Sequence, residues 1–227
     1  MPLAINISKL SFAWPGKNGF RLNINNWQVS SGSHVFLYGP SGSGKSTLLN
    51  LLSGVMPAQS GNLEVLAEEL TTLSARQRDR FRARHIGMIF QQFNLLPYLS
   101  GEQNIQLAGR FNGKNKLINT DYARYLYGQL ALSDNILQQD ASTLSVGQQQ
   151  RIAVARALIY QPELIIADEP TSALDTELRD SFVNLLLSNA THSTVIFVSH
   201  DRSLMPLFDQ QFDIRSLQNN VEAPDAD

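Results

Sequence analysis

The chain has 227 residues, a formal net charge of -2 and a pI of about 6.1, with 43% hydrophobic and 17% charged residues. A chain of this length can bury a substantial core, and its composition excludes an intrinsically disordered protein. The charge balance excludes the global basic field that gathers nucleic acid or anionic lipid. Because there is no cysteine, disulfides, thiolate chemistry and cysteine-bound zinc are excluded as well.

The first half of the chain predicts antiparallel strands followed by a strand–loop–helix unit. Residues 3–29 alternate apolar and polar positions on either side of a turn at 15–19, which favours antiparallel strands. The apolar run at 34–38 predicts a buried strand, which ends in a glycine-rich loop before a helical segment at 46–52. Five arginines between 76 and 84 are interpreted as belonging to a solvated helix face.

The second half alternates strands with helices. Apolar runs and helical periodicity predict, in order, strand 86–90, helix 145–160, strand 164–167, helix 177–187 and strand 195–198. Such alternation favours α/β architecture, a mainly parallel sheet with helices on both faces. Residues 91–143 break the alternation, so we expect one domain over 1–227 with a helical subdomain inserted at about 92–143. The polar tail 218–227 is expected to fray.

The sequence predicts neither a signal peptide nor a membrane-spanning segment. The first six residues lack the basic and apolar regions of a signal peptide. No apolar run approaches the length of roughly 20 residues that spans a bilayer. If the protein works at a membrane, we expect another chain to hold it there.

Residues 39–47 match the phosphate-binding loop pattern G-x-x-x-x-G-K-[ST], in the required place between a strand and a helix. The glycines let backbone N–H groups approach phosphates closely, and the helix offers its positive N-terminus to the anion. Lys45 is expected to bind the β- and γ-phosphates, and Ser46 to place its hydroxyl on Mg²⁺. The expected nucleotide-binding residues here are Gly39, Ser41, Gly42, Ser43, Gly44, Lys45, Ser46 and Thr47.

Two adjacent acids follow the apolar run at 164–167. Asp168, at the strand end, can reach the coordination shell of Mg²⁺. Glu169 can face the γ-phosphate and polarise an attacking water. Acids also cap strands without any function, so this interpretation depends on the phosphate-binding loop being present.

Residues 144–151, Leu-Ser-Val-Gly-Gln-Gln-Gln-Arg, lead into a predicted helix. Ser145 and Gln148 have the spacing of a capping box, so one interpretation is only a well-capped helix start. The other is that this helix N-terminus, with Ser145 and the small Gly147, binds a second phosphate group.

With these motifs, nearly the whole chain resembles the ABC (ATP-binding cassette) ATPase family. Residues 144–148 are similar to the family signature Leu-Ser-Gly-Gly-Gln at four of five positions, and Val146 replaces a glycine. As the first helical residue, Val146 is tolerable on the backbone, but its bulk could alter how tightly the nucleotide is held. The resemblance implies a P-loop NTPase core with an N-terminal antiparallel β subdomain and an inserted α-helical subdomain.

The resemblance also assigns roles in order along the chain. It implies that Gln91, with Gln92 as the alternative, contacts Mg²⁺ and the attacking water and senses a membrane partner. It implies that residues 172–175 cross to a partner subunit and that His200 contacts the γ-phosphate. The implied catalytic residues are Glu169, His200, Gln91 and Lys45, and the implied metal ligands are Ser46, Gln91 and Asp168. Further nucleotide contacts are implied for Trp14, with Phe12 as second choice for the adenine-stacking aromatic, and for Ser145, Gly147 and Gln148.

ATP and Mg²⁺ are the cofactors that the resemblance implies, bound in an ATP-dependent homodimer. It further implies a separate transmembrane permease, a peripheral position at the cytoplasmic face of the inner (plasma) membrane, and no nucleic acid partner. Residues 90–97 closely resemble the branch that serves lipoprotein release and macrolide export. The apolar segment 93–99 either packs within the helical insertion or forms a groove for a short cytoplasmic helix of the membrane subunit.

Two alternatives belong to other classes. A soluble ABC ATPase acting on nucleic acid or the ribosome usually has two cassettes, long coiled coils or zinc modules, and none of these is present in the sequence. A regulatory cassette would bind ATP without hydrolysing it, and the presence of both Glu169 and His200 argues against that.

Overall fold

The computed structural model describes residues 2–16, 20–110, 118–172 and 174–219. The strands are β1 (Leu3–Ala13), β2 (Arg21–Ser30), β3 (His34–Tyr38), β4 (Ser60–Val65), β5 (Glu68–Glu69), β6 (Ile86–Phe90), β7 (Leu164–Asp168), β8 (Thr194–Val198) and β9 (Gln210–Asp213). The helices are α1 (Lys45–Leu52), α2 (Ala75–His85), α3 (Gly101–Arg110), α4 (Thr120–Gln129), α5 (Asp134–Gln138), α6 (Val146–Leu158), α7 (Thr176–Asn189) and α8 (Ile214–Asn219). Short 3₁₀ helices lie at Leu70–Thr72, Ala141–Thr143 and Arg202–Leu207.

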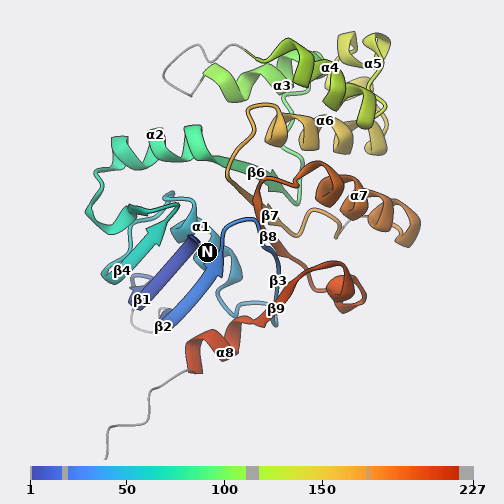
Figure 1. Ribbon diagram of the computed structural model, residues 1–227. Helices are drawn as coiled ribbons and strands as arrows, with labels where there is room; N and C mark the ends of the chain where they lie inside the picture. Colours follow the sequence, from blue (N-terminus) through green and yellow to red (C-terminus); the bar gives the residue numbers. More distant parts are fainter. Residues whose placement is uncertain (1, 17–19, 111–117, 173, 220–227) are drawn as a thin grey trace, which may run out of the picture.

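Two sheets organise the molecule (Figure 1). One is antiparallel over β1, β2, β4 and β5, in the order β2-β1-β4-β5, and Ile7 of β1 lies opposite Trp27 and Leu63. The other has the order β6-β7-β8-β3-β9, and all of its strand pairs are parallel. The predicted fold class is confirmed: a P-loop α/β core with an antiparallel β subdomain and a group of helices above it in Figure 1.

Side-chain alternation along the parallel strands divides the core into two layers. Ile165 and Phe197 point to the face that α6 and α7 cover, whereas Ile166 and Val198 point to the face that α1 and the antiparallel sheet cover. Successive side chains of a strand point to opposite faces, so a strand buried on both faces is apolar throughout. This explains why the continuous apolar run at 164–167 predicted a strand.

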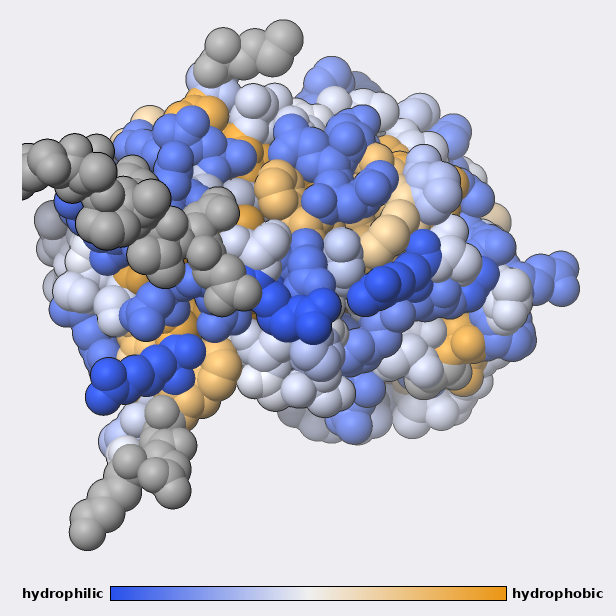
Figure 2. All heavy atoms as spheres, turned by 90° about the horizontal axis from the view of Figure 1, so that it is seen from below, coloured by the Kyte–Doolittle hydropathy of each residue, from blue (hydrophilic) through white to orange (hydrophobic). Residues whose placement is uncertain are grey.

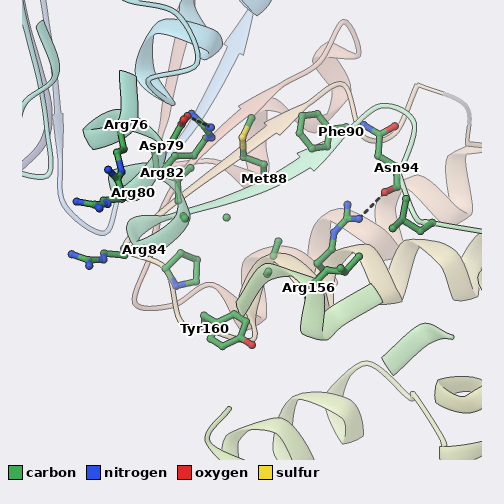
Figure 3. Close-up of a pocket in the computed structure, with 18 residues that line it drawn as sticks. Arg76, Asp79, Arg80, Arg82, Arg84, Met88, Phe90, Asn94, Arg156 and Tyr160 are labelled. Atoms are coloured by element: carbon green, nitrogen blue, oxygen red, sulfur yellow. Dashed lines mark hydrogen bonds and ion pairs between the residues drawn. The ribbon is translucent and has the colours of Figure 1, made fainter. Parts of the chain in front are cut away.

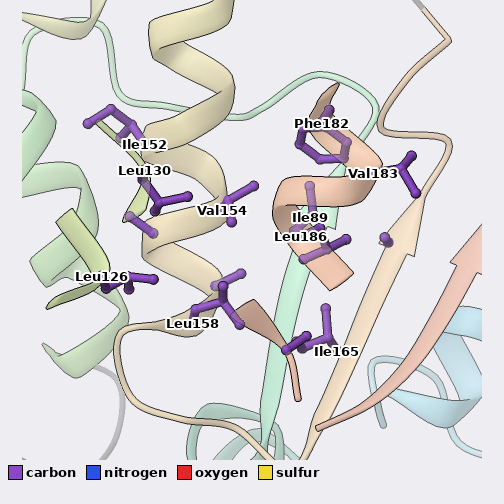
Figure 4. Close-up of a cluster of buried hydrophobic side chains, with 14 of the residues drawn as sticks. Ile89, Leu126, Leu130, Ile152, Val154, Leu158, Ile165, Phe182, Val183 and Leu186 are labelled. Atoms are coloured by element: carbon purple, nitrogen blue, oxygen red, sulfur yellow. The ribbon is translucent and has the colours of Figure 1, made fainter. Parts of the chain in front are cut away.

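Helix α6 joins the parallel sheet to the helices above it. Val154 and Leu158 pack with Ile165 and with α7, while Ile152 lies toward Leu126 and Leu130 (Figure 4). Because one helix is buried on both sides, α3, α4 and α5 are held against the core through α6 as well as through the chain connections.

Several segments differ from the expectation. Strands β4, β5 and β9 were not predicted. Gln218 was expected to fray, and this is wrong: it lies in α8 and donates a hydrogen bond to the carbonyl oxygen of Ser43 at 2.9 Å. Residues 220–227 of the predicted tail and residues 17–19 of the predicted turn lie outside the described residues.

The face seen from below in Figure 1 is mostly hydrophilic, with small separate hydrophobic patches between polar side chains (Figure 2). Within the described residues, every helix is too short or too polar to cross a bilayer.

Candidate active site

A cavity of about 470 Å³ lies where the phosphate-binding loop meets the carboxyl ends of the parallel strands. Strands β3, β7 and β8 are neighbours in register, with Leu37 and Asp168 both opposite Val198. The segments that follow these strands therefore meet at one edge of the sheet, which is where α/β proteins bind ligands. The residues lining this phosphate-loop cavity are Trp14, Phe20, Ser41, Gly42, Gly44, Lys45, Ser46, Thr47, Gln91, Asp168, Glu169 and His200.

The loop can exist only because Gly44 adopts a left-handed backbone with φ of 97°. A Cβ atom at this position would lie 2.5 Å from Cζ of Phe20, so a larger residue would be both strained and blocked. Gly44 is the N-cap of α1, and no side chain accepts a hydrogen bond there. The first N–H groups of α1 are consequently available to an anion.

The side chain of Lys45 is buried beneath the loop, with 6% exposure. Its Nζ donates to the carbonyl oxygens of Gly39 at 2.9 Å and Pro40 at 3.1 Å, and it lies 3.9 Å from Oε1 of Glu169. The ammonium group is thus held by dipoles and one carboxylate, inside the cavity where phosphate oxygens would lie.

Asp168 ends β7 beside the loop. Burial raises the pKa of its carboxyl group, and the opposing effects of a hydrogen bond with Ser46 and the charge of Lys45 are smaller. Hydroxyl, carboxylate and amide oxygens are the ligands that Mg²⁺ prefers, and Ser46, Asp168 and Gln91 supply them in this cavity. The donor set therefore fits a magnesium ion that is held jointly by a few protein oxygens and a nucleotide phosphate.

Glu169 has a strained backbone. Its φ is 48°, in the left-handed region, and its N–H donates to the carbonyl oxygen of Val198 at 3.0 Å. The carboxylate Oε1 lies 2.6 Å from Nε2 of His200. Non-glycine residues in this conformation are uncommon and are found mostly at functional sites. At this position the conformation directs the side chain of Glu169 toward His200, which follows β8.

The two candidate aromatics differ in position. Trp14 is 45% exposed, lines the cavity and donates from Nε1 to Oγ1 of Thr47 at 3.2 Å. Phe12 is only 6% exposed and meets Trp14 edge-on with ring centroids 5.5 Å apart, so it supports the tryptophan from within the core. Of the two glutamines considered, Gln91 lines the cavity and Gln92 is not among its lining residues.

Comparison with known proteins settles the family. Residues 22–172 match the ABC transporter family. The chain belongs to this family. The ABC transporter ATP-binding protein YbbA of Escherichia coli K12 is 38% identical over 178 residues, which cover 78% of each chain. The macrolide export ATP-binding/permease protein MacB of Burkholderia thailandensis is 40% identical over 177 residues.

The match to MacB covers 78% of this chain but only 27% of MacB, so the chain spans about a quarter of that relative. Among solved structures, the dimeric post-hydrolysis state of the ATP-binding cassette MJ0796 with ADP and Pi has a TM-score of 0.76 and 28% identity. That similarity covers 92% of this chain and 94% of the other. The protein is an ABC-type cassette that binds and hydrolyses ATP.

The signature segment of this ABC cassette lies away from the phosphate-loop cavity. Ser145 caps α6 in a capping box, with Gln148 N–H donating to Oγ of Ser145 at 3.3 Å and Ser145 N–H donating to Oε1 of Gln148 at 2.8 Å. Val146 begins the helix, as expected, and is 53% exposed. Ser145, Gly147 and Gln148 are not among the residues that line the cavity.

The segment 172–175 leads from β7 into α7. Asp175 caps that helix, accepting a hydrogen bond from the N–H of Leu178 at 2.9 Å, and Ala173 lies outside the described residues.

Two residues of the phosphate-binding loop, Gly39 and Ser43, are not among the residues that line the phosphate-loop cavity. The carbonyl oxygen of Gly39 accepts a hydrogen bond from Lys45, and the buried hydroxyl of Ser43 has no hydrogen-bond partner among the described residues.

Sequence reasoning missed Phe20. It lies directly before β2, and the N–H of Trp14 donates to its carbonyl oxygen at 3.0 Å. The ABC cassette thus has two aromatic residues lining the cavity, one directly after β1 and one directly before β2. The predicted hairpin around residues 15–19 carried a signal for this, since it places residues 14 and 20 opposite each other.

Proposed function

We propose that this chain is the ATP-hydrolysing subunit of an ABC transporter, a single domain that works as an ATP-dependent homodimer with a separate membrane permease. One observation carries the proposal: Lys45, Asp168, Glu169 and His200 line one cavity with the phosphate-binding loop. A cassette that only bound ATP would need the phosphate-binding loop. It would not need Glu169, with its strained backbone, to be paired with His200 in the same cavity.

Binding of ATP is assigned to the loop and its neighbours. Lys45 exchanges its carbonyl contacts for the β- and γ-phosphates, and the free N–H groups at the start of α1 meet the phosphate oxygens. Trp14 presents an exposed ring to the adenine. The edge-on contact with buried Phe12 fixes the orientation of that ring.

Mg²⁺ is assigned to Ser46, Asp168 and Gln91, and when bound it neutralises phosphate charge. The ionised form of Asp168 is disfavoured by burial, and the proximity of Lys45 and Ser46 only partly offsets this. The residue is therefore poised to gain from a nearby cation.

Hydrolysis is assigned to Glu169 and His200. Glu169 orients and polarises the attacking water through its carboxylate. Nε2 of His200 lies 2.6 Å from Oε1 of Glu169, and the contact with the γ-phosphate is assigned to His200. The pair lies at the ends of two adjacent strands, so the sheet itself fixes their separation.

A second copy completes the site in this proposal. Ser145, Gly147 and Gln148 do not line the cavity of their own chain, and Ser145 lies at an exposed helix N-terminus that suits an anion. Each ATP would lie between the loop of one copy and this N-terminus of the other. The γ-phosphate then favours the closed dimer, because its charge must be satisfied from both sides.

The permease partner places the chain at the cytoplasmic face of the inner (plasma) membrane, as a peripheral subunit of an exporter or envelope-acting system. Support comes from the names of relatives such as MacB, in which an ATP-binding part and a permease are combined. Of the apolar segment 93–99, Leu95 packs against the core, while Asn94 and Leu96 line a separate cleft that could receive the permease.

Affinity purification from gently solubilised membranes of the native cell tests the proposal. An integral membrane protein that co-purifies in a fixed ratio, together with ATP hydrolysis by the complex, supports it. Recovery of only soluble proteins or nucleic acid would leave the nucleotide chemistry intact and overturn the transport assignment.

A further inference from the structure

The parallel sheet has two edge strands, β6 and β9. Beside β6 lies the cleft assigned above to the permease, about 1230 Å³ in volume and bounded by α2, α3 and α6, where Arg156 donates to the carbonyl oxygen of Asn94 at 2.8 Å (Figure 3). At the opposite edge, β9 leads directly into α8. The proposed function gives no part to α8, although this helix contacts the phosphate-binding loop.

Helix α8 begins beside the loop because of the strand register. Strands β3 and β9 are parallel neighbours, with Tyr38 opposite Asp213. The residue after Tyr38 is Gly39, the first of the loop, and the residue after Asp213 is Ile214, the first of α8. A Cβ atom at Gly39 would lie 2.7 Å from Cγ2 of Ile214. The helix therefore packs directly on the loop backbone, at a distance that only glycine allows.

The hydrophobic core holds α8 in place. Ile214 and Leu217 are buried in the core layer that also contains Leu37 of β3. Just before the helix, Phe212 meets Trp27 of β2 edge-on, with ring centroids 5.7 Å apart. Because these contacts do not involve the loop, α8 is a support whose position does not depend on the loop.

One face of α8 reaches the loop at two points. Ile214 and Gln218 are four residues apart, so they lie on the same face of the helix. Ile214 packs on Gly39, and Nε2 of Gln218 donates to the carbonyl oxygen of Ser43 at 2.9 Å. Neither Gly39 nor Ser43 is among the residues that line the phosphate-loop cavity. The helix thus supports the loop from outside the cavity.

The hydrogen bond from Gln218 also orients the next peptide group. The peptide bond between Ser43 and Gly44 is planar and trans, so its C=O and N–H point in opposite directions. Turning the carbonyl oxygen toward α8 turns the N–H of Gly44 away from α8. Gly44 lines the cavity and is the N-cap of α1. Since glycine has wide backbone freedom, a contact that fixes this peptide group restricts the loop where it is most free to rotate.

We propose that Gln218 is a positioning residue for the phosphate-binding loop, because its hydrogen bond to Ser43 holds the N–H of Gly44 in the orientation that meets the phosphates of ATP. The proposal rests on the nucleotide assignment above and adds a support from outside the loop. A donor that is already oriented binds phosphate without the entropic cost of ordering a glycine-rich segment. Gln218 therefore contributes to affinity for the nucleotide rather than to the chemical step.

The test uses full-length variants at position 218. Gln218→Met and Gln218→Glu keep the length of the side chain and remove the donor, whereas Gln218→Lys supplies a donor again. All four residue types have similar helix propensity, so α8 itself should be unaffected. Ser216→Ala is the matched control, because it removes a hydrogen bond of the same helix, from Oγ of Ser216 to the carbonyl oxygen of Asp213 at 2.7 Å. Lys45→Ala is the reference for loss of phosphate binding.

Affinity is measured by titration with a fluorescent ATP analogue and by its displacement with tripolyphosphate, which has phosphates but no adenine. We expect Gln218→Met and Gln218→Glu to weaken both by roughly three- to tenfold, the effect of one hydrogen bond. KM for ATP should rise while kcat and the thermal stability of the nucleotide-free protein stay unchanged. Gln218→Lys should recover the affinity, also at about 1 M salt, which screens an exposed charge beyond roughly 3 Å. Ser216→Ala should match wild type.

Wild-type affinity in Gln218→Met, with binding lost in Lys45→Ala, overturns the role of Gln218 and leaves the nucleotide site standing. A loss for ATP without a loss for tripolyphosphate overturns it as well, since the phosphates are then not involved. Equal losses in Gln218→Met and Ser216→Ala would assign the effect to the stability of α8. A fall in kcat with unchanged KM would place Gln218 in the chemical step instead. If Lys45→Ala binds ATP as wild type does, the nucleotide assignment fails, and the role of Gln218 fails with it.

Discussion

Nε2 of His200 lies 2.6 Å from Oε1 of Glu169, and the same carboxylate oxygen lies 3.9 Å from Nζ of Lys45. One oxygen atom thus connects the end of β8, the end of β7 and the phosphate-binding loop. Because the backbone N–H of Glu169 donates to the carbonyl oxygen of Val198 at 3.0 Å, the side chain can be altered without freeing the segment that carries it.

Glu169→Gln should keep ATP binding and lose turnover by roughly 10²- to 10⁴-fold, because the amide cannot polarise water as the carboxylate does. The uncleaved γ-phosphate should then hold two copies together. Phosphate release measures the first effect, and size-exclusion chromatography with and without ATP measures the second.

Glu163→Gln is the matched control, since this exposed carboxylate pairs with His85 and lies outside the cavity. It should hydrolyse ATP at the wild-type rate. A Glu169→Gln variant that stays monomeric at all ATP concentrations contradicts the proposed dimer.

Asp168→Asn should raise the thermal stability of the nucleotide-free protein at neutral pH. Burial raises the pKa of Asp168 in the folded state, so the folded protein binds the proton more tightly than the unfolded chain does. For such an acid, stability falls as pH rises from the unfolded pKa through the folded pKa. The asparagine removes this penalty, and its Oδ1 can still accept from Ser46.

Thermal melts across pH check the sign. The difference in Tm between the variant and wild type should be absent below the unfolded pKa and grow as pH rises through the raised folded pKa. Asp121→Asn, on a 94% exposed side chain, should show no such growth. The Asp168 variant should also lose the stabilisation that Mg²⁺ with ATP gives wild type; unchanged stabilisation contradicts the metal assignment.

The parts of the fold that the sequence predicted are those with a local signal. Strands β7 and β8 are buried on both faces, so they are continuous apolar runs. The phosphate-binding loop and the two acids Asp168 and Glu169 at the end of β7 can be recognised from short runs of neighbouring residues. Parallel strands with aligned ends then bring these motifs together without further information.

The parts that were missed depend on contacts distant in the sequence. Strand β4 contains Gly61 and polar residues, and it exists because it pairs with β1 some 50 residues earlier; Gly61 has a φ of 82°, and a Cβ there would lie 2.1 Å from the carbonyl oxygen of Lys9. The arginine face of α2 was interpreted as a solvated helix face. The helix is real, but only the packing of β6 and α3 beside it creates the cleft.

Trp14→Ala should weaken ATP binding by roughly tenfold, the loss expected for one base stacked on an aromatic ring. Thermal stability should change little, because the ring is 45% exposed. Titration with a fluorescent ATP analogue measures the affinity, and Trp14→Phe separates stacking from the hydrogen bond to Thr47.

Phe12→Ala gives the contrasting control. Its ring is buried, so its loss should destabilise the fold by about 3 to 5 kcal/mol and affect ATP only through the support it gives Trp14. If Phe12→Ala weakens binding while Trp14→Ala does not, the adenine assignment is wrong and Phe20 becomes the ring to examine.

Arg179 of α7 offers a test of how the histidine is positioned. It forms an ion pair with Asp201, the residue after His200, and a second with Asp180 at 2.7 Å. Arg179→Gln should lower kcat by roughly tenfold with little change in KM, because a small displacement of a catalytic group is costly while Arg179 itself lies outside the cavity. Arg179→Lys should recover part of the rate. Arg215→Gln, which breaks the ion pair with Asp213, should leave kcat unchanged. Equal losses in kcat for Arg179→Gln and Arg215→Gln would mean that Arg179 has no special part in holding His200.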